Sequence, residues 1–468
     1  MGQTVQTTIG AQEDITVFLN NLSLYAQDSW KLSPKLTLNL GLRWELNPAP
    51  SGSKPLYSYT PTADPREITL APAGAPLYAT RYNGFAPRVG AAYQIARNTT
   101  LRAGFGLFYD LGGGLMAQAA AGFPYYRQNN IITGTPFPVP PSTAAPLPFT
   151  LNPPIASIYG ATPGLSLPVT YQWNVTVEQL LNRSNAVSVA YVAAAGRDLL
   201  RQNFDTNPTD SITYAYMLNN AAFSNFNSLQ VQYHRTLTQG IQALISYTFA
   251  HSIDNASNES YAYLLAPIIN PKDDYGSSDF DIRHALSAAF SANLPTRWLK
   301  GWGLDGVYLF RTATPVDVTY SLDNGYGVYA FRPDLVPGVP IYLNNPDVAG
   351  GKQFNPDAFE IPLDYPGRQG TLGRNALRGF GFSQVNFTVR REFHLYEQLK
   401  LQFRAELFNA LNTPSFGNPS GNLQSPQFGY STGTLAQSLG SGGVNGGLNP
   451  LYQVGGARSV QLALRLVF

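Results

Sequence analysis

The sequence of 468 residues contains no cysteine. This absence excludes a disulfide framework, a thiolate metal site and a cysteine nucleophile. Charged residues make up only 12% of the chain, roughly half of what a soluble globular protein carries. The 30 basic and 28 acidic residues nearly cancel, so the chain lacks the positive field that attracts nucleic acid, and we expect no nucleic-acid partner.

The sequence also lacks any run of about 18 apolar residues, which a transmembrane helix would need. Aromatic residues are common, at 13%, and the chain contains 43 glycines and 36 prolines. The mean hydropathy of -0.13 is compatible with a membrane barrel, because barrel strands turn every second side chain toward a polar lumen. The composition is therefore rich in turns and aromatic residues and poor in charge.

Apolar and polar residues alternate with a period of two in segments of about ten residues, the length that a tilted strand needs to cross a membrane. The clearest of these segments is the last one in the sequence. One of its faces is apolar and consists of Val460, Leu462, Leu464, Leu466 and Phe468. The opposite face carries Gln461 and Arg465, so this pattern predicts a strand with one side toward lipid and the other toward water.

The same alternation predicts about 13 to 14 strands, thirteen of them clear, as part of a larger all-β antiparallel transmembrane β-barrel. The predicted strand centres are Leu24, Leu40, Val89, Phe105, Val175, Val189, Val231, Ile245, Ala288, Tyr308, Phe387, Phe403 and Leu464. Short links between them, such as Lys31 to Pro34, alternate strictly with long ones, such as Ala194 to Phe226 and Thr312 to Gly379. This alternation is typical of outer-membrane barrels with short periplasmic turns and long extracellular loops.

Four segments resemble the barrel of TonB-dependent receptors, especially the Oar-like branch. They are residues 24–31 (LYAQDSWK), 85–93 (FAPRVGAAY), 281–284 (DIRH) and 401–412 (LQFRAELFNALN). The resemblance runs from about residue 20 to the end of the chain. It implies energised uptake of a bulky nutrient across the outer membrane, with a plug domain inside the barrel and an N-terminal segment that binds TonB. It also implies that the terminal aromatic residue, Phe468, is the signal for the barrel assembly machinery.

The start of the sequence shows neither a plug, nor a TonB-binding segment, nor a basic region followed by an apolar stretch that would predict a signal peptide. The strand at Leu24 leads into a short turn, so it runs toward the periplasm and its chain enters from outside. A complete bacterial barrel has an even number of strands and both ends in the periplasm. We therefore expect residues 1–468 to be the C-terminal portion of a larger barrel, with residues 4–9 as the remnant of a further strand.

Few side chains suggest a specific site. Asp273, Asp274, Asp279 and Asp281 crowd one loop and would suit calcium, although a solvated loop in which Asp281 bonds the next strand is the favoured interpretation. Arg404 and Glu406 share one strand face, where an ion pair is favoured over a substrate contact. We predict no catalytic residue, no metal site and no cofactor, and the sequence does not identify the ligand-binding residues.

The four histidines, His234, His251, His284 and His394, have no metal-binding spacing, and strand alternation places His234 on the lumen side. Loop tyrosines such as Tyr125 and Tyr216 suit either ligand stacking or loop packing.

The leading hypothesis is an outer-membrane receptor and transporter barrel that contacts lipid, a nutrient ligand and, in a longer form, TonB. A passive pore or a surface adhesin with the same loops is the alternative. A third hypothesis is a secreted all-β carbohydrate-binding protein or glycosidase, which would not need detergent for extraction.

Overall fold

The architecture was obtained from a computed structural model of the chain. It describes residues 2–3, 7–57, 59–60, 69–110, 114, 117, 122–131, 136–142, 145, 151–152, 155–162, 164–209, 212–257, 271–294, 297–323, 328–362, 369–396, 398–435 and 454–467. Phe468, the predicted assembly signal, lies outside these residues. Among the described residues, no helix is both long and apolar enough to cross a membrane.

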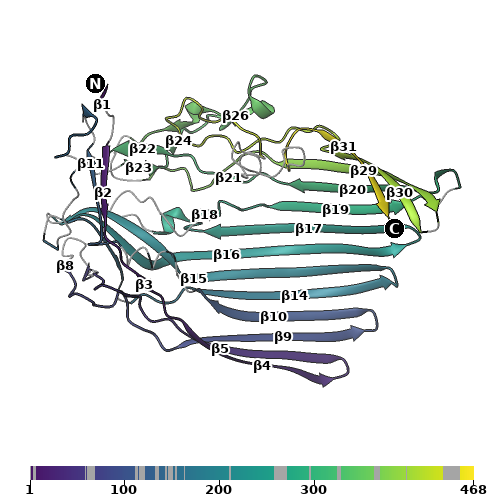
Figure 1. Cartoon of the computed structure of the whole chain (residues 1–468), viewed down its shortest axis with the longest axis horizontal. Helices are drawn as coiled ribbons and strands as arrows, with labels where there is room; N and C mark the ends of the chain where they lie inside the picture. The colour runs from purple at the N-terminus through teal and green to yellow at the C-terminus, as the bar shows by residue number, and fades with distance from the viewer. Residues whose placement is uncertain are drawn as a thin grey trace.

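The fold is one large β-sheet of 15 strands, with a path of thirteen strands paired side by side (Figure 1). Each of the thirteen predicted strand centres lies inside a different strand of this path, so the predicted strands are confirmed. In spatial order the strands are β4 (Leu22–Ser33), β5 (Leu36–Leu46), β9 (Gly84–Ala96), β10 (Thr99–Tyr109), β14 (Val169–Asn182), β15 (Asn185–Thr209), β16 (Ile212–Thr238), β17 (Ile241–Asp254), β19 (His284–Asn293), β20 (Trp302–Arg311), β29 (Phe382–Tyr396), β30 (Leu399–Phe408) and β31 (Ser459–Val467).

The connections divide between the two rims of the sheet. Short turns join β4 to β5, β9 to β10, β14 to β15, β16 to β17, β19 to β20 and β29 to β30, and they lie at the right of Figure 1. We call this side the short-turn rim. The remaining connections lie at the opposite, long-loop rim. The predicted alternation of short and long connections is therefore present, except that β15 and β16 are joined by a short connection at the long-loop rim.

The turn between β16 and β17 illustrates how the sequence closes a tight hairpin. Gln239 and Gly240 stand between the paired residues Thr238 and Ile241, and both have positive φ, at 54° and 78°. Two-residue hairpin turns of this kind match the twist of the strands they join. Gly240 also needs its missing side chain, because a Cβ there would approach the carbonyl oxygen of Asn293 to 2.9 Å.

Side-chain alternation gives the sheet one apolar and one polar face. In β5, Leu40 lies opposite Val89, while the neighbouring Gly41 lies opposite Arg88. At the other edge, Leu464 lies opposite Phe403, and Gln461 lies opposite Glu406. Because paired residues in a sheet share a face, the apolar residues on this face of neighbouring strands lie side by side in an apolar strip, which Asp28 interrupts opposite Leu40. Leu464 is 70% exposed on this strip.

The sheet is open at both ends in the part of the chain that the structure describes. There, β4 pairs with β5 alone in the main sheet, and β31 pairs with β30 alone. Successive strands on the path are antiparallel, so the first and the thirteenth run in the same direction. Direct pairing of β4 with β31 would be parallel, which an antiparallel barrel does not use.

Two predictions about local structure are wrong. The link from Ala194 to Phe226 was expected to be a long loop, but β15 and β16 continue through it as a bulged hairpin as far as Thr209 and Ile212. Residues 4–9 were expected to be the remnant of a further barrel strand, and residues 4–6 lie outside the described residues. The prediction is wrong for residues 7–9. They belong instead to β2 (Thr7–Gln12), which pairs with β11 (Tyr126–Ile131) in a separate sheet.

Short strands and 3-10 helices lie at the long-loop rim. The strands are β1 (Gly2–Gln3), β3 (Val17–Phe18), β6 (Ser51–Gly52), β7 (Tyr59–Thr60), β8 (Thr69–Leu70), β12 (Pro136–Phe137), β13 (Ile155–Ala161), β18 (Gly276–Ser277), β21 (Pro315–Val316), β22 (Tyr320–Asp323), β23 (Val328–Phe331), β24 (Asp334–Leu335), β25 (Tyr342–Asn344), β26 (Lys352–Phe354), β27 (Phe359–Glu360) and β28 (Leu377–Arg378). The 3-10 helices are η2 (Pro271–Asp274), η4 (Ala349–Gly351) and η5 (Pro356–Ala358) on this rim, with η3 (Arg297–Leu299) on the short-turn rim.

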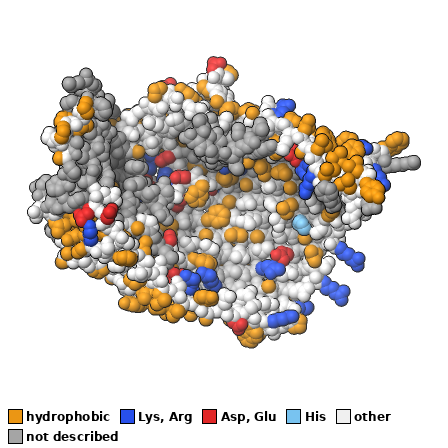
Figure 2. All heavy atoms as spheres, in the orientation of Figure 1, with side chains coloured by type: hydrophobic (Ala, Val, Ile, Leu, Met, Phe, Trp, Pro, Cys, Tyr) orange, Lys and Arg blue, Asp and Glu red, His pale blue; other side chains and the backbone are white. Residues whose placement is uncertain are grey.

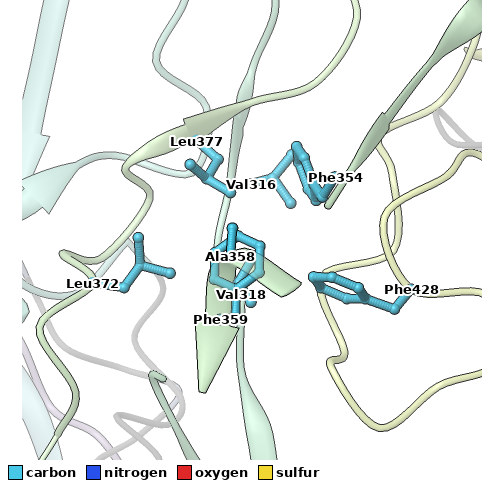
Figure 3. Packing of buried hydrophobic residues seen from close by; sticks show 8 residues of the cluster. All are labelled: Val316, Val318, Phe354, Ala358, Phe359, Leu372, Leu377 and Phe428. Atoms are coloured by element: carbon cyan, nitrogen blue, oxygen red, sulfur yellow. The ribbon is translucent and has the colours of Figure 1, made fainter. Parts of the chain in front are cut away.

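The hydrophobic core clusters of the described residues lie toward the long-loop rim, in the loops and in the extended ends of β15 and β16. In the largest of these clusters, residues of the β20–β29 loop pack against Phe428 of the β30–β31 loop (Figure 3). The ring of Phe359 meets that of Phe428 edge to face at 5.5 Å, and the backbone N–H of Phe354 donates to the carbonyl of Gly429 at 2.9 Å. The two loops therefore fold as one unit, here called the loop domain.

Candidate functional site

A cluster of arginine and aspartate side chains lies where the loop domain meets β15 and the end of β17. We call it the rim cluster. Its members are Arg201, Asp254, Asp274, Asp279, Asp281, Asp317, Arg332, Arg374 and Arg378. Figure 2 shows acidic and basic side chains together at the long-loop end of a hollow over the central strands.

Asp274 joins two segments of the cluster. Its carboxylate accepts a hydrogen bond from Nη2 of Arg201 at 2.6 Å and another from Nη1 of Arg332 at 2.8 Å. All three side chains are buried, with exposed fractions of 0%, 9% and 7% for Arg201, Asp274 and Arg332. Buried charges of this kind need both the opposite charge and the hydrogen bonds, so the contact fixes the positions of all three segments.

Arg374 of the β20–β29 loop makes the second junction. Its guanidinium donates to Oδ1 of Asp254 at 2.7 Å and to Oδ1 of Asp279 at 3.0 Å. Burial opposes the charge on Arg374, but the hydrogen bond to Asp254 and the charges of Asp254, Asp279 and Asp317 outweigh this effect and raise the pKa of the guanidinium. Arg374 therefore holds the end of β17 to the loop domain.

Asp281 forms the third junction and caps the end of β17. Its carboxylate accepts from the backbone N–H of Ser252 at 2.8 Å, from Arg378 at 2.7 Å and faces Nδ1 of His251 at 3.2 Å. Burial alone would raise the pKa of Asp281, but the hydrogen bonds from Ser252, Arg378 and His251 lower it below the ordinary value. Asp281 is therefore held in its charged form.

Asp317 behaves differently from the other acids of the rim cluster. Within the described residues, its Oδ1 accepts a hydrogen bond from the backbone N–H of Asn375 at 3.2 Å. Burial raises the pKa of Asp317, and the positive charges of Arg332 and Arg374 offset this effect only in part. Burial therefore disfavours the ionised form of Asp317.

The structure corrects the predicted solvated loop at Asp273–Asp281. Asp274 and Asp281 are buried, and their partners are arginines that lie 58 to 97 residues away in sequence. Asp281 bonds β17 and the β20–β29 loop, whereas the sequence suggested the start of the next strand. Among the described residues, no group of three or more histidine or acidic side chains has the arrangement of a metal site. The arginines were missed because their partners are remote in the chain.

The polar face carries the second feature of interest, a groove of about 400 Å³ across β16 to β30. His234 lines it as predicted, together with Leu244, Val307, Asp305 and Glu406. Nη2 of Arg404 lies 2.8 Å from Oε1 of Glu406, so the predicted ion pair is present. Leu244 and Val307 are 42% and 38% exposed, which gives the polar face an apolar patch.

The other histidines lie apart from this groove. His251 faces Asp281, and Nδ1 of His284 lies 2.8 Å from the hydroxyl of Tyr247 on the apolar face. Of the loop tyrosines, Tyr125 is buried and Tyr216 stacks on Tyr159 with ring centroids 4.5 Å apart. Loop packing is therefore what the structure shows for these two.

Comparison with known proteins identifies the class to which this arrangement belongs. Residues 1–439 match the family model described as the outer membrane beta barrel domain. The chain belongs to this family, and its place is the outer membrane. Because short turns of such barrels face the periplasm and long loops face the exterior, the rim cluster and the loop domain are extracellular. A comparison with curated proteins gives no significant match.

Solved structures with similarity to the chain include a transporter, a siderophore receptor and an iron transporter. The outer membrane transporter YddB from Escherichia coli is 9% identical, with a TM-score of 0.47 and coverage of 96% of this chain and 54% of that chain. The siderophore receptor PiuA from Acinetobacter baumannii is 10% identical, with a TM-score of 0.48 and coverage of 96% and 43%. The FrpB iron transporter from Neisseria meningitidis is 10% identical, with a TM-score of 0.47 and coverage of 96% and 46%. The chain spans about half the length of these structures.

Proposed function

We propose that the chain is the wall of an outer-membrane receptor and transporter, which captures a bulky nutrient at its extracellular loops and passes it through the lumen. In this proposal the complete protein uses TonB to drive the passage. The observation that carries the proposal is the rim cluster. Asp274 holds the extracellular end of the β15–β16 hairpin and the loop domain in one fixed arrangement above the lumen.

A receptor needs a shaped capture surface, and a passive pore needs an open mouth. The β20–β29 and β30–β31 loops share a hydrophobic core and are tied to the strands through Arg374 and Arg378. Loops that are ordered in this way favour specific capture. The segments that resemble TonB-dependent receptors, among them residues 24–31 and 401–412, support energised uptake over diffusion.

The two free edges of the sheet support the further proposal that residues 1–468 are the C-terminal portion of a larger barrel. Both β4 and β31 run toward the periplasm, so an odd number of additional strands must lie between them in an antiparallel barrel. An open edge in lipid would leave backbone groups unpaired, at several kcal/mol each. The plug domain and the TonB-binding segment would then belong to the same longer protein.

Uptake by whole cells tests the proposed function. A strain that lacks the gene and a strain that carries it would be compared for accumulation of a panel of radiolabelled oligosaccharides, peptides and ferric chelates, with and without a protonophore. We expect the gene to support accumulation of at least one large compound, and the protonophore to abolish it. Accumulation that survives the protonophore would indicate a passive pore. Equal accumulation by both strains, with a difference only in surface attachment, would indicate an adhesin.

A further inference from the structure

Two adjacent arginines of β29 lie on opposite faces of the barrel wall. Arg390 lies on the polar face, where its guanidinium donates to Asp305 at 3.0 Å and to Asn293 at 2.6 Å. Gly303 makes room for it, because a Cβ at that position would clash with the guanidinium. Arg391 lies on the apolar face, in register with Trp302 and Phe403. The sheet therefore carries one arginine into the lumen and the next into the lipid-facing surface.

Arg391 has aromatic neighbours instead of acidic ones. Its guanidinium carbon lies 4.9 Å from the ring centre of Trp302 and 5.1 Å from that of Phe393. Glu392 is not its partner, because this side chain accepts from Gln402 in the lumen. Within the described residues, Arg391 forms no ion pair, and its Nε is buried without a hydrogen-bond partner. A guanidinium on a lipid-facing surface is costly unless an anion or water compensates its charge.

The turn beside Arg391 carries two exposed apolar side chains. Residues 294–301 connect β19 to β20, and the carbonyl of Gly301 accepts from the backbone N–H of Glu392 at 2.8 Å. Trp298 in this turn is 92% exposed, and Leu299 is 43% exposed. Lys300 adds an exposed cation. Tryptophan is enriched at the headgroup level of membranes, where its ring is apolar and its N–H remains hydrated.

We propose that these residues bind a phospholipid of the periplasmic leaflet. The site, here called the periplasmic corner, consists of Trp298, Lys300, Trp302, Arg391 and Phe393. The phosphate group of the lipid compensates Arg391 and Lys300, and Trp298 inserts beside it at the headgroup level. The occupant is a membrane lipid because the corner continues the apolar strip of β20, β29 and β30, which faces the hydrocarbon, at the rim that carries the short turns.

Lipid retention tests the site, and the arginine pair provides a matched control. Three proteins would be compared: the unaltered chain, the Arg391→Gln variant and the Arg390→Gln variant. Each would be extracted from outer membranes in mild detergent, and the bound phospholipid would be counted by native mass spectrometry. We expect Arg391→Gln to lower the retained phospholipid about fivefold, which corresponds to roughly 1 kcal/mol for one arginine at an anionic headgroup. Arg390→Gln should retain as much as the unaltered chain. Equal retention by all three proteins, or loss in both variants, would overturn the proposal.

Chemical labelling tests the position of the turn without relying on detergent. The chain has no cysteine, so a single introduced cysteine reacts without background. Leu299→Cys and Arg183→Cys would be compared, since Arg183 is an exposed residue of the β14–β15 turn on the same rim. In outer membranes opened by freezing and thawing, a charged maleimide should modify Arg183→Cys rapidly and Leu299→Cys several times more slowly. Equal rates would mean that the turn lies in water, which would contradict lipid insertion.

Discussion

Nη2 of Arg201 lies 2.6 Å from Oδ2 of Asp274, and the two residues are separated by 73 positions in the sequence. Arg201 extends from the β15–β16 hairpin, and Asp274 belongs to the β17–β19 loop. The other carboxylate oxygen of Asp274 is taken by Arg332 of the loop domain. Although charged residues are few in this chain, several of them therefore lie together in the rim cluster, where the extracellular segments meet.

Replacement of Asp274 by alanine should release this junction. The variant leaves two buried guanidinium groups without their carboxylate, a change that typically costs about 3 to 5 kcal/mol. Because the strands below do not depend on the contact, we expect faster hydrogen exchange in residues 271–283 and 328–362 and no change in β9, β10 or β14. Asp347→Asn is the control, since Asp347 is an exposed residue of the same loop domain. Unchanged exchange in the Asp274 variant would show that the loops do not need the junction.

The pH dependence of the loops should reflect the opposite pKa shifts of Asp281 and Asp317. The lowered pKa of Asp281 means that its charge contributes stability above the ordinary carboxyl pKa, and that this stability is lost as the pH falls through the lowered value. We therefore expect Asp281→Asn to destabilise the loops at neutral pH, by about 1 to 3 kcal/mol, and to have little effect in strong acid. Protease protection of residues 312–378 across a pH series measures this effect.

Asp317 should give the opposite result. Its raised pKa means that it contributes stability below the ordinary carboxyl pKa, and that this contribution is lost as the pH rises through the raised value. Asp317→Asn should therefore increase the protease protection of the loops at neutral pH. A loss of protection in this variant at neutral pH would show that the charge of Asp317 stabilises the rim cluster.

The final strand provides a test of the two faces. Leu464 lies opposite Phe403 on the apolar face, and Gln461 lies opposite Glu406 on the polar face. Leu464→Arg should destabilise the folded barrel by about 2 to 4 kcal/mol if this position is near the middle of the bilayer, whereas Gln461→Arg should have little effect. Urea titrations of protein folded into lipid vesicles measure both values. Equal destabilisation by the two variants would mean that the faces are assigned incorrectly.

Deletion of Phe468 should lower assembly into the outer membrane and leave the stability of the finished barrel almost unchanged. The reason is the resemblance that assigns the signal for the assembly machinery to the terminal aromatic residue. Immunoblots of outer-membrane fractions measure the amount of assembled protein, and urea titrations measure its stability. Equal amounts of assembled protein with and without Phe468 would show that this residue is not the assembly signal.

The sequence predicted the membrane-facing part of the fold well because the physical constraint there is local. Each strand must alternate apolar and polar residues to satisfy lipid and lumen, so the positions of Leu40 or Leu464 followed from their neighbours. Above the membrane that constraint ends. The continuation of β15 beyond Ala194 lacks the alternation, and it is set by pairing with β16, so a loop was predicted instead.

The rim cluster was not predictable for a different reason. The aspartates at 273–281 stand out in the sequence, but Arg201, Arg332 and Arg374 do not, and nothing local relates them to their partners. Only the order of the strands brings them together. The ion pair of Arg404 and Glu406 was predicted because both residues lie on the same face of one strand, two positions apart.

Accessibility of single cysteines in living cells tests the central claim most directly, because the chain has no cysteine of its own. Asp347→Cys in the loop domain and Arg183→Cys in the β14–β15 turn would be exposed to a maleimide that does not cross the outer membrane. A barrel with its loop domain outside predicts that intact cells label Asp347→Cys at once, and that Arg183→Cys is labelled only after the outer membrane is permeabilised. Labelling of Arg183→Cys in intact cells, or protection of Asp347→Cys, would contradict the account.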